Sequence, residues 1–413
     1  MLKPNGVPIL IRRTHEERIL GALRDNGPLP RSEIELRVGL SRTTVSEITG
    51  SLLARGAIVE TDAHEPRRGR GRPAARLALD PTSGQFLGID FGHRRVYVAT
   101  VNASNEIIGS GATQYAEDAA WPERIDRAFD LITRIESESG IRFSALEAVG
   151  IGVSGPVGPG ANARASRWSG AASRNAVEMI HDAFVSRFDA PILIDNNTRF
   201  AGLAEAVWDR SDDVDSLLYV RLADGVGGGL VVGGRLVVGS FGMAGEIGHV
   251  SVPSESNQCW CGKSGCLETV ASVPAIIRAA QQHVPSVREL ADVADAIGDP
   301  GVLDAVTYAA RSLADILATV SAVVDPREIV VAGDVLRLGP VFFDAVLEQF
   351  AHATGPELHS GVRLRPSTLD EEAGALGAIA AAFHRSPLLA GYRALATANP
   401  ATARPVTNAK AVR

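Results

Sequence analysis

Two similar strand-turn-strand patterns constrain the fold of this chain more than any other feature of its sequence. The first, "FLGIDFGHRRVYVATVNASNEIIG", predicts a strand, a turn at Gly92 and two further strands. The second, "DSLLYVRLADGVGGGLVVGGRLVVG", predicts two strands around a glycine-rich turn. Further strand patterns alternate with helical patterns after each of them. We therefore expect an α/β fold over residues 84–386, with two lobes around a cleft.

The first 80 residues have a different pattern, that of a winged helix-turn-helix domain. A capping box at Thr14 and Glu17 begins a first helix, and two short helices follow it, joined by a tight turn at Gly39. The strand patterns "AIVETDA" and "ARLALDP" then flank the loop "HEPRRGRGRP". These residues hold 14 Lys+Arg against 10 Asp+Glu, a charge of +4 in a chain whose total is −7. Residues 1–80 are therefore predicted to bind a polyanion such as DNA.

Two groups of side chains in this domain are candidates for DNA contacts. The early turns of the third helix would enter the major groove, and the arginines of the loop would reach the adjoining minor groove. The alternatives are a helical unit that only packs or contacts protein, and a loop that is a solvated linker. The presence of both signals in one domain favours DNA binding over these alternatives. The candidates are Arg42, Thr43, Thr44 and Ser46 on the helix, and Arg67, Arg68, Arg70 and Arg72 in the loop.

All three cysteines of the chain fall within eight residues, a pattern typical of metal ligands in a reducing compartment. With the preceding histidine they have the spacing His-x9-Cys-x-Cys-x4-Cys, a complete tetrahedral set for Zn²⁺ with no position open to water. We predict a structural zinc site in loop 249–266, formed by His249, Cys259, Cys261 and Cys266. Because the sequence contains neither a membrane-spanning apolar run nor a signal-peptide pattern, we expect a cytoplasmic protein.

Polar side chains around the predicted metal site indicate a ligand with many hydroxyl groups. Glu246 and Glu268 flank the loop, and His249 has a second ring nitrogen to offer if the first binds metal. Asn196 and Asn197 stand in "IDNNTRFAGLAEA", where a strand pattern gives way to a helix pattern. Carboxylates and amides that converge suit a sugar, because each sugar hydroxyl both donates and accepts.

These motifs together resemble the ROK family of repressors and sugar kinases, in its transcriptional-regulator branch. The resemblance covers roughly residues 14 to 385 and rests on "GIDFG", "GVSGPV", "IDNN", "GVGGG", "AGEIGH", the cysteine spacing and the late "AGDVLRLG". It implies an actin-like fold of the sugar kinase and heat-shock ATPase type, zinc, a sugar or sugar-phosphate effector, and homodimers or homotetramers. The sugar-binding role then falls on Gly155, Asn196, Asn197, Glu246, His249 and Glu268.

The catalytic pattern of the family's kinases is changed in this chain. Asn197 stands where those kinases have an Asp that takes the proton from the sugar hydroxyl, and an amide cannot accept that proton. Two turns that meet the nucleotide phosphates in the kinases differ as well, at His93 to Arg95 and at Ala223 and Asp224. Arg199 stands where those kinases usually have another Asn, so the family pattern does not predict the exact shape of the pocket.

We therefore expect a sugar-responsive DNA-binding regulator without catalysis, a repressor of carbohydrate genes that binds a pseudo-palindromic operator. The alternative is an ATP-dependent sugar kinase with an accessory DNA-binding head. The sequence leaves the sugar and its phosphorylation open, because segment 163–175, with Arg164, Arg167 and Arg174, departs from the family pattern. Residues 387–413 are rich in Ala, Pro and Thr without periodicity, and we expect them to be disordered.

Overall fold

The computed structural model of the protein describes residues 15–16, 18–23, 26–54, 58–61, 75–79, 85–102, 106–140, 143, 146–158, 174–188, 190–208, 216–253, 255–359 and 361–385. Several predictions fall outside these residues. They concern Thr14 and Glu17, the loop arginines Arg67, Arg68, Arg70 and Arg72, the residues Arg164 and Arg167, the side chain of Arg174, and the segment 387–413. Within the described residues, none of the helices combines the length and the apolar character that a bilayer crossing needs.

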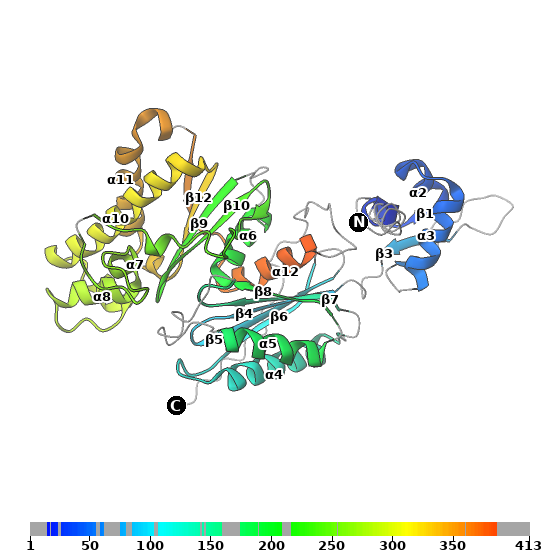
Figure 1. The fold of residues 1–413 in the computed structure, drawn as a ribbon, viewed down its shortest axis with the longest axis horizontal. Helices are drawn as coiled ribbons and strands as arrows, with labels where there is room; N and C mark the ends of the chain where they lie inside the picture. The colour runs from blue at the N-terminus through cyan, green and yellow to red at the C-terminus, as the bar shows by residue number, and fades with distance from the viewer. Residues whose placement is uncertain are drawn as a thin grey trace.

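Residues 15–79 form a small unit of helices and a three-stranded antiparallel sheet (Figure 1). Helical residues 18–23 precede α2 (Arg31–Val38) and α3 (Arg42–Ala54), and the sheet order is β1-β3-β2, with β1 Leu29–Pro30, β2 Ile58–Thr61 and β3 Arg76–Leu79. Gly39 ends α2 in the left-handed conformation, at φ 61°, as the predicted turn requires. Ser41 caps α3, since its hydroxyl accepts the Thr44 amide at 3.2 Å. The core of this small unit includes the buried side chains of Ile19, Ile34, Val45 and Leu77.

Strand β1 was not predicted from the sequence. It has only two residues, so it shows no periodic pattern, and it is defined by its antiparallel pairing with β3. Strand β1 is therefore an edge strand, on the side of β3 opposite to β2.

The two lobes that follow contain sheets of the same design, as the repeated strand-turn-strand pattern predicts. Their strand orders are β6-β5-β4-β7-β8 and β11-β10-β9-β12-β13. In each sheet an antiparallel meander comes first in the chain. The next strand then pairs in parallel with the first strand of the meander, and the last strand pairs in parallel with that one. The first sheet consists of β4 (Gln85–Phe91), β5 (Arg95–Val101), β6 (Ile107–Gln114), β7 (Leu146–Val153) and β8 (Ile192–Asn196). The second consists of β9 (Ser216–Leu222), β10 (Val226–Val232), β11 (Arg235–Leu236), β12 (Glu328–Ala332) and β13 (Arg363–Pro366).

Two helices, α6 (Asn197–Trp208) and α12 (Ala373–Arg385), lie between the sheets and pack against each other (Figure 1). Helix α12 approaches both α6 and β7 closely because glycines stand at the contacts. A Cβ added to Gly377 of α12 would lie 1.7 Å from the carbonyl oxygen of Phe200, and one on Gly150 of β7 would lie 2.3 Å from that of Ala378. This packing directs the first turn of α6 into the space between the lobes.

The remaining helices cover the outer faces of the sheets. Helices α4 (Trp121–Ser139) and α5 (Arg174–Arg187) cover the first sheet (Figure 1). The second lobe is completed by α8 (Val273–Gln281), α9 (Leu290–Asp295), α10 (Pro300–Val324) and α11 (Pro340–His359), with the short elements η2 (Ile247–His249), α7 (Glu268–Ala271) and η3 (Asp334–Leu338). Each lobe has a buried apolar core on the outer face of its sheet. A further apolar cluster around α6 and α12 joins the inner faces of the two sheets.

Candidate functional site

A cavity of about 680 Å³ is lined by residues from both lobes. The turn after β4 and the loop after β7 contribute to it from the first lobe, and the β9–β10 turn and the loop after β12 contribute from the second. Two groups of lining residues carry its chemistry. The cysteine-side wall consists of Gly155, Asn197, Glu246, His249, Trp260 and Glu268. The arginine-side wall consists of His93, Arg94, Arg95, Arg221, Asp224, Asp334, Arg337 and Glu371.

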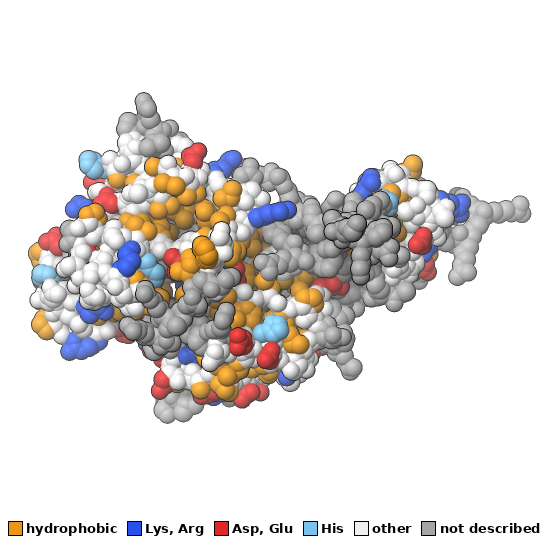
Figure 2. All heavy atoms as spheres, in the orientation of Figure 1, with side chains coloured by type: hydrophobic (Ala, Val, Ile, Leu, Met, Phe, Trp, Pro, Cys, Tyr) orange, Lys and Arg blue, Asp and Glu red, His pale blue; other side chains and the backbone are white. Residues whose placement is uncertain are grey.

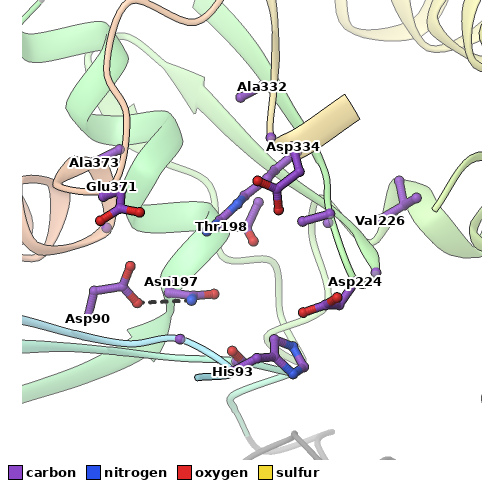
Figure 3. A pocket seen from close by; sticks show the side chains of 18 of the residues that line it. Asp90, His93, Asn197, Thr198, Asp224, Val226, Ala332, Asp334, Glu371 and Ala373 are labelled. Atoms are coloured by element: carbon purple, nitrogen blue, oxygen red, sulfur yellow. Dashed lines mark hydrogen bonds between the residues drawn. The ribbon is translucent and has the colours of Figure 1, made fainter. Parts of the chain in front are cut away.

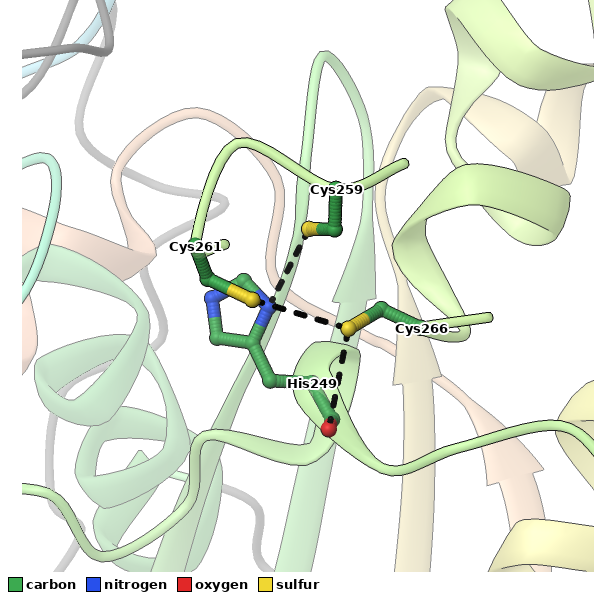
Figure 4. A group of neighbouring side chains, drawn as sticks. All are labelled: His249, Cys259, Cys261 and Cys266. Carbon is green, nitrogen blue, oxygen red and sulfur yellow. Dashed lines mark hydrogen bonds between the residues drawn. The ribbon is translucent and has the colours of Figure 1, made fainter. Parts of the chain in front are cut away.

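The four predicted metal ligands come together beside the pocket (Figure 4). Their ligand atoms lie within 4.8 Å of one another. The His249 Nδ1 atom is 3.7 Å from the Cys259 Sγ, and the Cys261 and Cys266 sulfurs are 3.6 Å apart, too far for a disulfide bond of about 2 Å. Burial raises the pKa of the Cys259 and Cys266 thiols, so a bound cation would be needed to hold them as thiolates at neutral pH. Three sulfurs and one imidazole, with no carboxylate among the ligands, fit a tetrahedral soft-metal site.

The loop that gathers these ligands depends on two of its glycines. Gly262 and Gly265 both have positive φ, at 92° and 71°. A Cβ on Gly265 would lie 2.4 Å from the carbonyl oxygen of Glu255, so the chain can cross itself there only without a side chain. The sulfurs are brought to His249 by this fold of the loop.

The two adjacent amides at the start of α6 have different tasks. Asn196 is the last residue of β8, and its Oδ1 accepts the backbone amides of Thr198 at 2.9 Å and Arg199 at 3.1 Å. Its Nδ2 donates to the carbonyl of Gly155 at 2.7 Å. Asn196 therefore caps the helix and holds the Gly155 turn, and it is not one of the residues that line the pocket.

Asn197 is the amide that faces the pocket (Figure 3). Its Nδ2 donates to the Oδ1 of Asp90 at 2.9 Å. Asp90 is buried, and burial raises the pKa of its carboxyl group, an effect that the positive charge of Arg221 and the Asn197 bond partly offset. Within the described residues, no donor is bonded to the Asn197 Oδ1. Asn197 can therefore offer an acceptor to a ligand, but no basic group.

Glu246 and Glu268 both line the pocket and differ in their partners. Within the described part of the chain, the Glu246 carboxylate has no hydrogen-bond donor. Burial raises the pKa of Glu246, against the nearby charge of Arg199. The Glu268 carboxylate accepts the Val226 amide at 3.0 Å and the indole N–H of Trp260. Glu246 is thus open to a ligand, whereas Glu268 first orients its neighbours.

Trp260 is a lining residue that the sequence analysis missed. Its ring stands edge-on to that of His249, with centroids 4.9 Å apart. The signal was present, because a residue between two metal ligands, as in "CWC", must lie at the metal loop. The indole gives the cysteine-side wall a flat apolar face beside its polar groups.

Three arginines of the arginine-side wall are paired with carboxylates. Arg94 donates to Glu117 at 2.8 Å and Arg95 forms an ion pair with Glu371. The Nε of Arg337 lies 3.7 Å from the Asp334 carboxylate. Asp224 faces His93 (Figure 3), whose pKa burial lowers and Asp224 partly restores. Of these residues, His93 to Arg95 and Asp224 were predicted from the sequence. Arg221, Asp334, Arg337 and Glu371 were not, because they come from distant segments.

Comparisons with known proteins agree with this geometry. The model of the ROK family matches residues 86–385. The xylose repressor of Bacillus spizizenii is 23% identical over 381 residues, which are 89% of this chain and 94% of the repressor. The glucokinase of Halalkalibacterium halodurans is 32% identical over 205 residues, which are 45% of this chain and 62% of the kinase.

Among solved structures, a ROK family transcriptional regulator, homologous to the E. coli MLC protein, has a TM-score of 0.72 and 22% identity to this chain. The match covers 92% of this chain and 98% of that one. The family model spans both lobes and every residue of the two pocket walls. The chain belongs to the ROK family.

Proposed function

We propose that this protein is a sugar-responsive transcriptional regulator, which binds DNA through residues 1–80 and a sugar or sugar phosphate between the lobes of residues 84–386. One observation carries the proposal. The pocket keeps open acceptors on its cysteine-side wall, Asn197 stands where the kinases of the family have their catalytic base, and Arg94, Arg95 and Arg337 of the arginine-side wall are each paired with a carboxylate. The xylose repressor aligns over 89% of the chain, so the similarity extends beyond the two lobes. Repression of carbohydrate genes fits that relative.

Sugar binding is assigned to the cysteine-side wall. The Asn197 Oδ1 and the Glu246 carboxylate accept hydrogen bonds from sugar hydroxyls, and the second ring nitrogen of His249 is available for another. Glu268 keeps the metal loop against β10 through Val226 and adds a further acceptor. Asn196 acts one step away, because it holds the carbonyl of Gly155 on the pocket's rim.

Phosphoryl transfer is not supported by the same site. The Asn197 amide cannot take a proton from an attacking hydroxyl, and its Nδ2 is already bonded to Asp90. Asp224 and Asp334 line the arginine-side wall, where nucleotide phosphates would lie in a family kinase. Each such carboxylate repels a phosphate by about 1 kcal/mol in water and by more in a cleft of lower dielectric. The protein is therefore assigned no catalytic residue.

DNA recognition is assigned to α3 and to the loop between β2 and β3. Arg42, Thr43 and Ser46 are exposed on the early turns of α3, as contacts to base edges require. Thr44 is half-buried, and its hydroxyl is 2.8 Å from that of Ser41, so it supports the helix cap as well. The predicted minor-groove contacts of Arg67, Arg68, Arg70 and Arg72 remain part of the proposal. A homodimer or homotetramer would present two such heads to a pseudo-palindromic operator.

The metal is proposed to be Zn²⁺ in a structural role. His249, Cys259, Cys261 and Cys266 would hold it, and all four positions would be filled by protein, which leaves none for catalysis. Bound there, it would fix the loop that carries Trp260 and ends at α7. A regulator of this kind acts on DNA in the cytoplasm.

A gel-shift assay tests the proposal. DNA upstream of the protein's own gene is titrated with the full chain, alone and with D-xylose, D-glucose, N-acetyl-D-glucosamine and their phosphates. We expect specific retardation that weakens steeply with salt, and a loss of affinity with at least one sugar. Arg42→Gln should weaken binding roughly tenfold, whereas Arg134→Gln, an exposed arginine of α4, should not. Absence of retardation, or of salt dependence, would refute a DNA-binding role.

The alternative function, a sugar kinase with a DNA-binding head, makes a different prediction. It requires ADP release from ATP with some hexose, and loss of that release in Asn197→Ala. Our proposal expects no release with the wild-type chain, and none with Asn197→Asp, because Asp224 and Asp334 stay in place. Turnover by the wild-type chain would establish the kinase.

A further inference from the structure

Arg199 is the largest fully buried side chain among the described residues, and the proposed function gives it no role. It stands in the first turn of α6, two residues after Asn197, and only 1% of its surface is exposed. It does not line the pocket. A guanidinium group removed from water to this extent needs partners, so its partners reveal what it holds.

The guanidinium group of Arg199 bonds to three different segments. Its Nε donates to the Asp195 Oδ1 at 2.9 Å, and the two side chains form a buried ion pair. Its Nη1 donates to the carbonyl of Gly242 at 2.6 Å, and its Nη2 donates to the carbonyl of Val157 at 2.9 Å. The ion pair offsets the burial of charge, and the two carbonyl bonds are additional to it.

The two carbonyls belong to the two sides of the pocket. Val157 is part of the Gly155 turn (155–158), which follows β7 of the first lobe and lines the pocket at Gly155. Gly242 is part of the Glu246 segment (239–246), which follows β11 of the second lobe and ends at the lining residue Glu246. One side chain thus bridges the lobes directly behind the cysteine-side wall.

Backbone contacts show that these segments are fitted to each other. A Cβ on Gly242 would lie 2.4 Å from the Val157 carbonyl oxygen and 2.9 Å from the Gly158 Cα, and Gly242 itself has φ 72°. The backbones of these two segments are therefore in direct contact, with no side chain between them. On the outer side of the same segment, Phe241 is 68% exposed, so the segment lies between the buried bridge and solvent.

We propose that Arg199 is a positioning residue that fixes the Gly155 turn to the Glu246 segment, so that a ligand bound between the lobes displaces both together and the regulator responds. The response to ligand rests on the proposed function, whereas the mechanical link does not. A purely structural role, in which Arg199 only neutralises Asp195, makes a different prediction. It requires the charge but neither carbonyl bond.

Lysine separates these two roles. Arg199→Lys keeps a charge that can pair with Asp195, but an ammonium group lacks the planar fork that reaches both carbonyls. Because the variant could fold poorly, a second one, Asp195→Asn with Arg199→Gln, removes both charges at similar volume. The matched control is Arg124→Lys. Arg124 is also buried and donates to two carbonyls, of Ala119 and Glu117, but it contacts neither segment.

Hydrogen exchange of the full-length free protein tests the mechanical link. We expect amides of 239–246 to exchange about tenfold faster or more in both Arg199 variants, since each lost bond involved a charged donor. The Ala244 amide, bonded to the Val238 carbonyl at 3.2 Å, is the most informative. The Arg124→Lys control should leave this segment unchanged. Wild-type rates in a folded Arg199→Lys variant, or equal acceleration in the Arg124→Lys control, would overturn the proposal.

DNA release by sugar tests the second part. With D-xylose, D-glucose or N-acetyl-D-glucosamine as the probe, Arg199→Lys should bind operator DNA as the wild type does but lose most of the sugar-induced release. A full response in this variant would contradict the coupling. If none of the three probes releases the wild type, the proposed sugar response is at fault, and the exchange rates still decide the role of Arg199.

Discussion

The two walls of the pocket differ in whether their polar groups have partners within the protein. On the cysteine-side wall, Glu246 and the Asn197 Oδ1 have no hydrogen-bond donor among the described residues, and both face the cavity. On the arginine-side wall, the chain supplies carboxylate partners for three of the arginines, as in Arg95 with Glu371. A wall with open acceptors can bind a ligand, whereas a wall whose charges are already paired gains little from one. Under the proposed function, this difference corresponds to sugar contacts that are kept and phosphate contacts that are lost.

Loss of the metal site should have the largest effect, because it removes the support of the cysteine-side wall. A structural metal present at a thousand times its dissociation constant adds about 4 kcal/mol to the free energy of unfolding. That corresponds to roughly 10 °C in the melting temperature of a domain of this size. We expect a fall of this order for Cys261→Ser and for the wild type with a strong chelator, measured by calorimetry.

The control lies in the same loop. Lys263 donates from its exposed Nζ to the His249 carbonyl at 2.8 Å, so Lys263→Gln should shift the melting temperature by only a few degrees. A wild type whose melting temperature is unaffected by the chelator would show that the four ligands hold no metal that matters for stability.

A pair of matched substitutions tests the contrast between the walls directly. Glu246→Gln removes a charged acceptor from the cysteine-side wall, and Asp224→Asn does the same on the arginine-side wall. A hydrogen bond to a charged group contributes about 1.5–3 kcal/mol, so Glu246→Gln should weaken sugar binding roughly 10- to 100-fold. Asp224→Asn should change it less than about twofold. Calorimetric titration measures both, and equal losses in the two variants would remove the distinction that we draw.

The sequence predicted the cysteine-side wall better than the arginine-side wall for a physical reason. His249, Cys259, Cys261 and Cys266 are close in the chain, so their spacing alone indicates that they meet. Asp334 and Glu371 reach the pocket from loops after β12 and β13. Only the strand order of the second sheet brings those loops to the pocket, and strand order is set by pairing between distant segments.

Asn196 illustrates a different limit. The sequence showed a strand followed by a helix but not which of the two amides ends the strand. The structure ends β8 at Asn196, which makes that residue the cap and leaves Asn197 to face the cavity. A shift of one residue would exchange the two tasks, and element boundaries are the least certain part of a sequence-based prediction. The role of Arg199 was equally hidden, because its partners Val157 and Gly242 lie about forty residues away on either side.

Asp90 lies where the two walls meet, and its titration should give the smallest of the three effects. Asn197 donates to it from one wall, and Arg95 and Arg221 of the other lower its pKa, but burial outweighs them and the pKa is raised. The folded protein therefore keeps a proton on Asp90 to higher pH than the unfolded chain does. By linkage, the free energy of unfolding decreases as the pH rises from the ordinary Asp value through the raised pKa.

Asp90→Asn removes this titration and can still bond to Asn197. We expect the stability of the variant, relative to the wild type, to increase as the pH rises from mildly acidic to neutral, measured by urea unfolding at a series of pH values. The opposite slope would mean that Arg95 and Arg221 dominate, and that the arginine-side wall stabilises a charged carboxylate at Asp90. The wall would then present a net positive charge to the pocket in the absence of Asp90, and Asp90→Asn should bind inorganic phosphate more tightly than the wild type. With burial dominant, as we expect, phosphate affinity should not change at a pH below the raised pKa of Asp90.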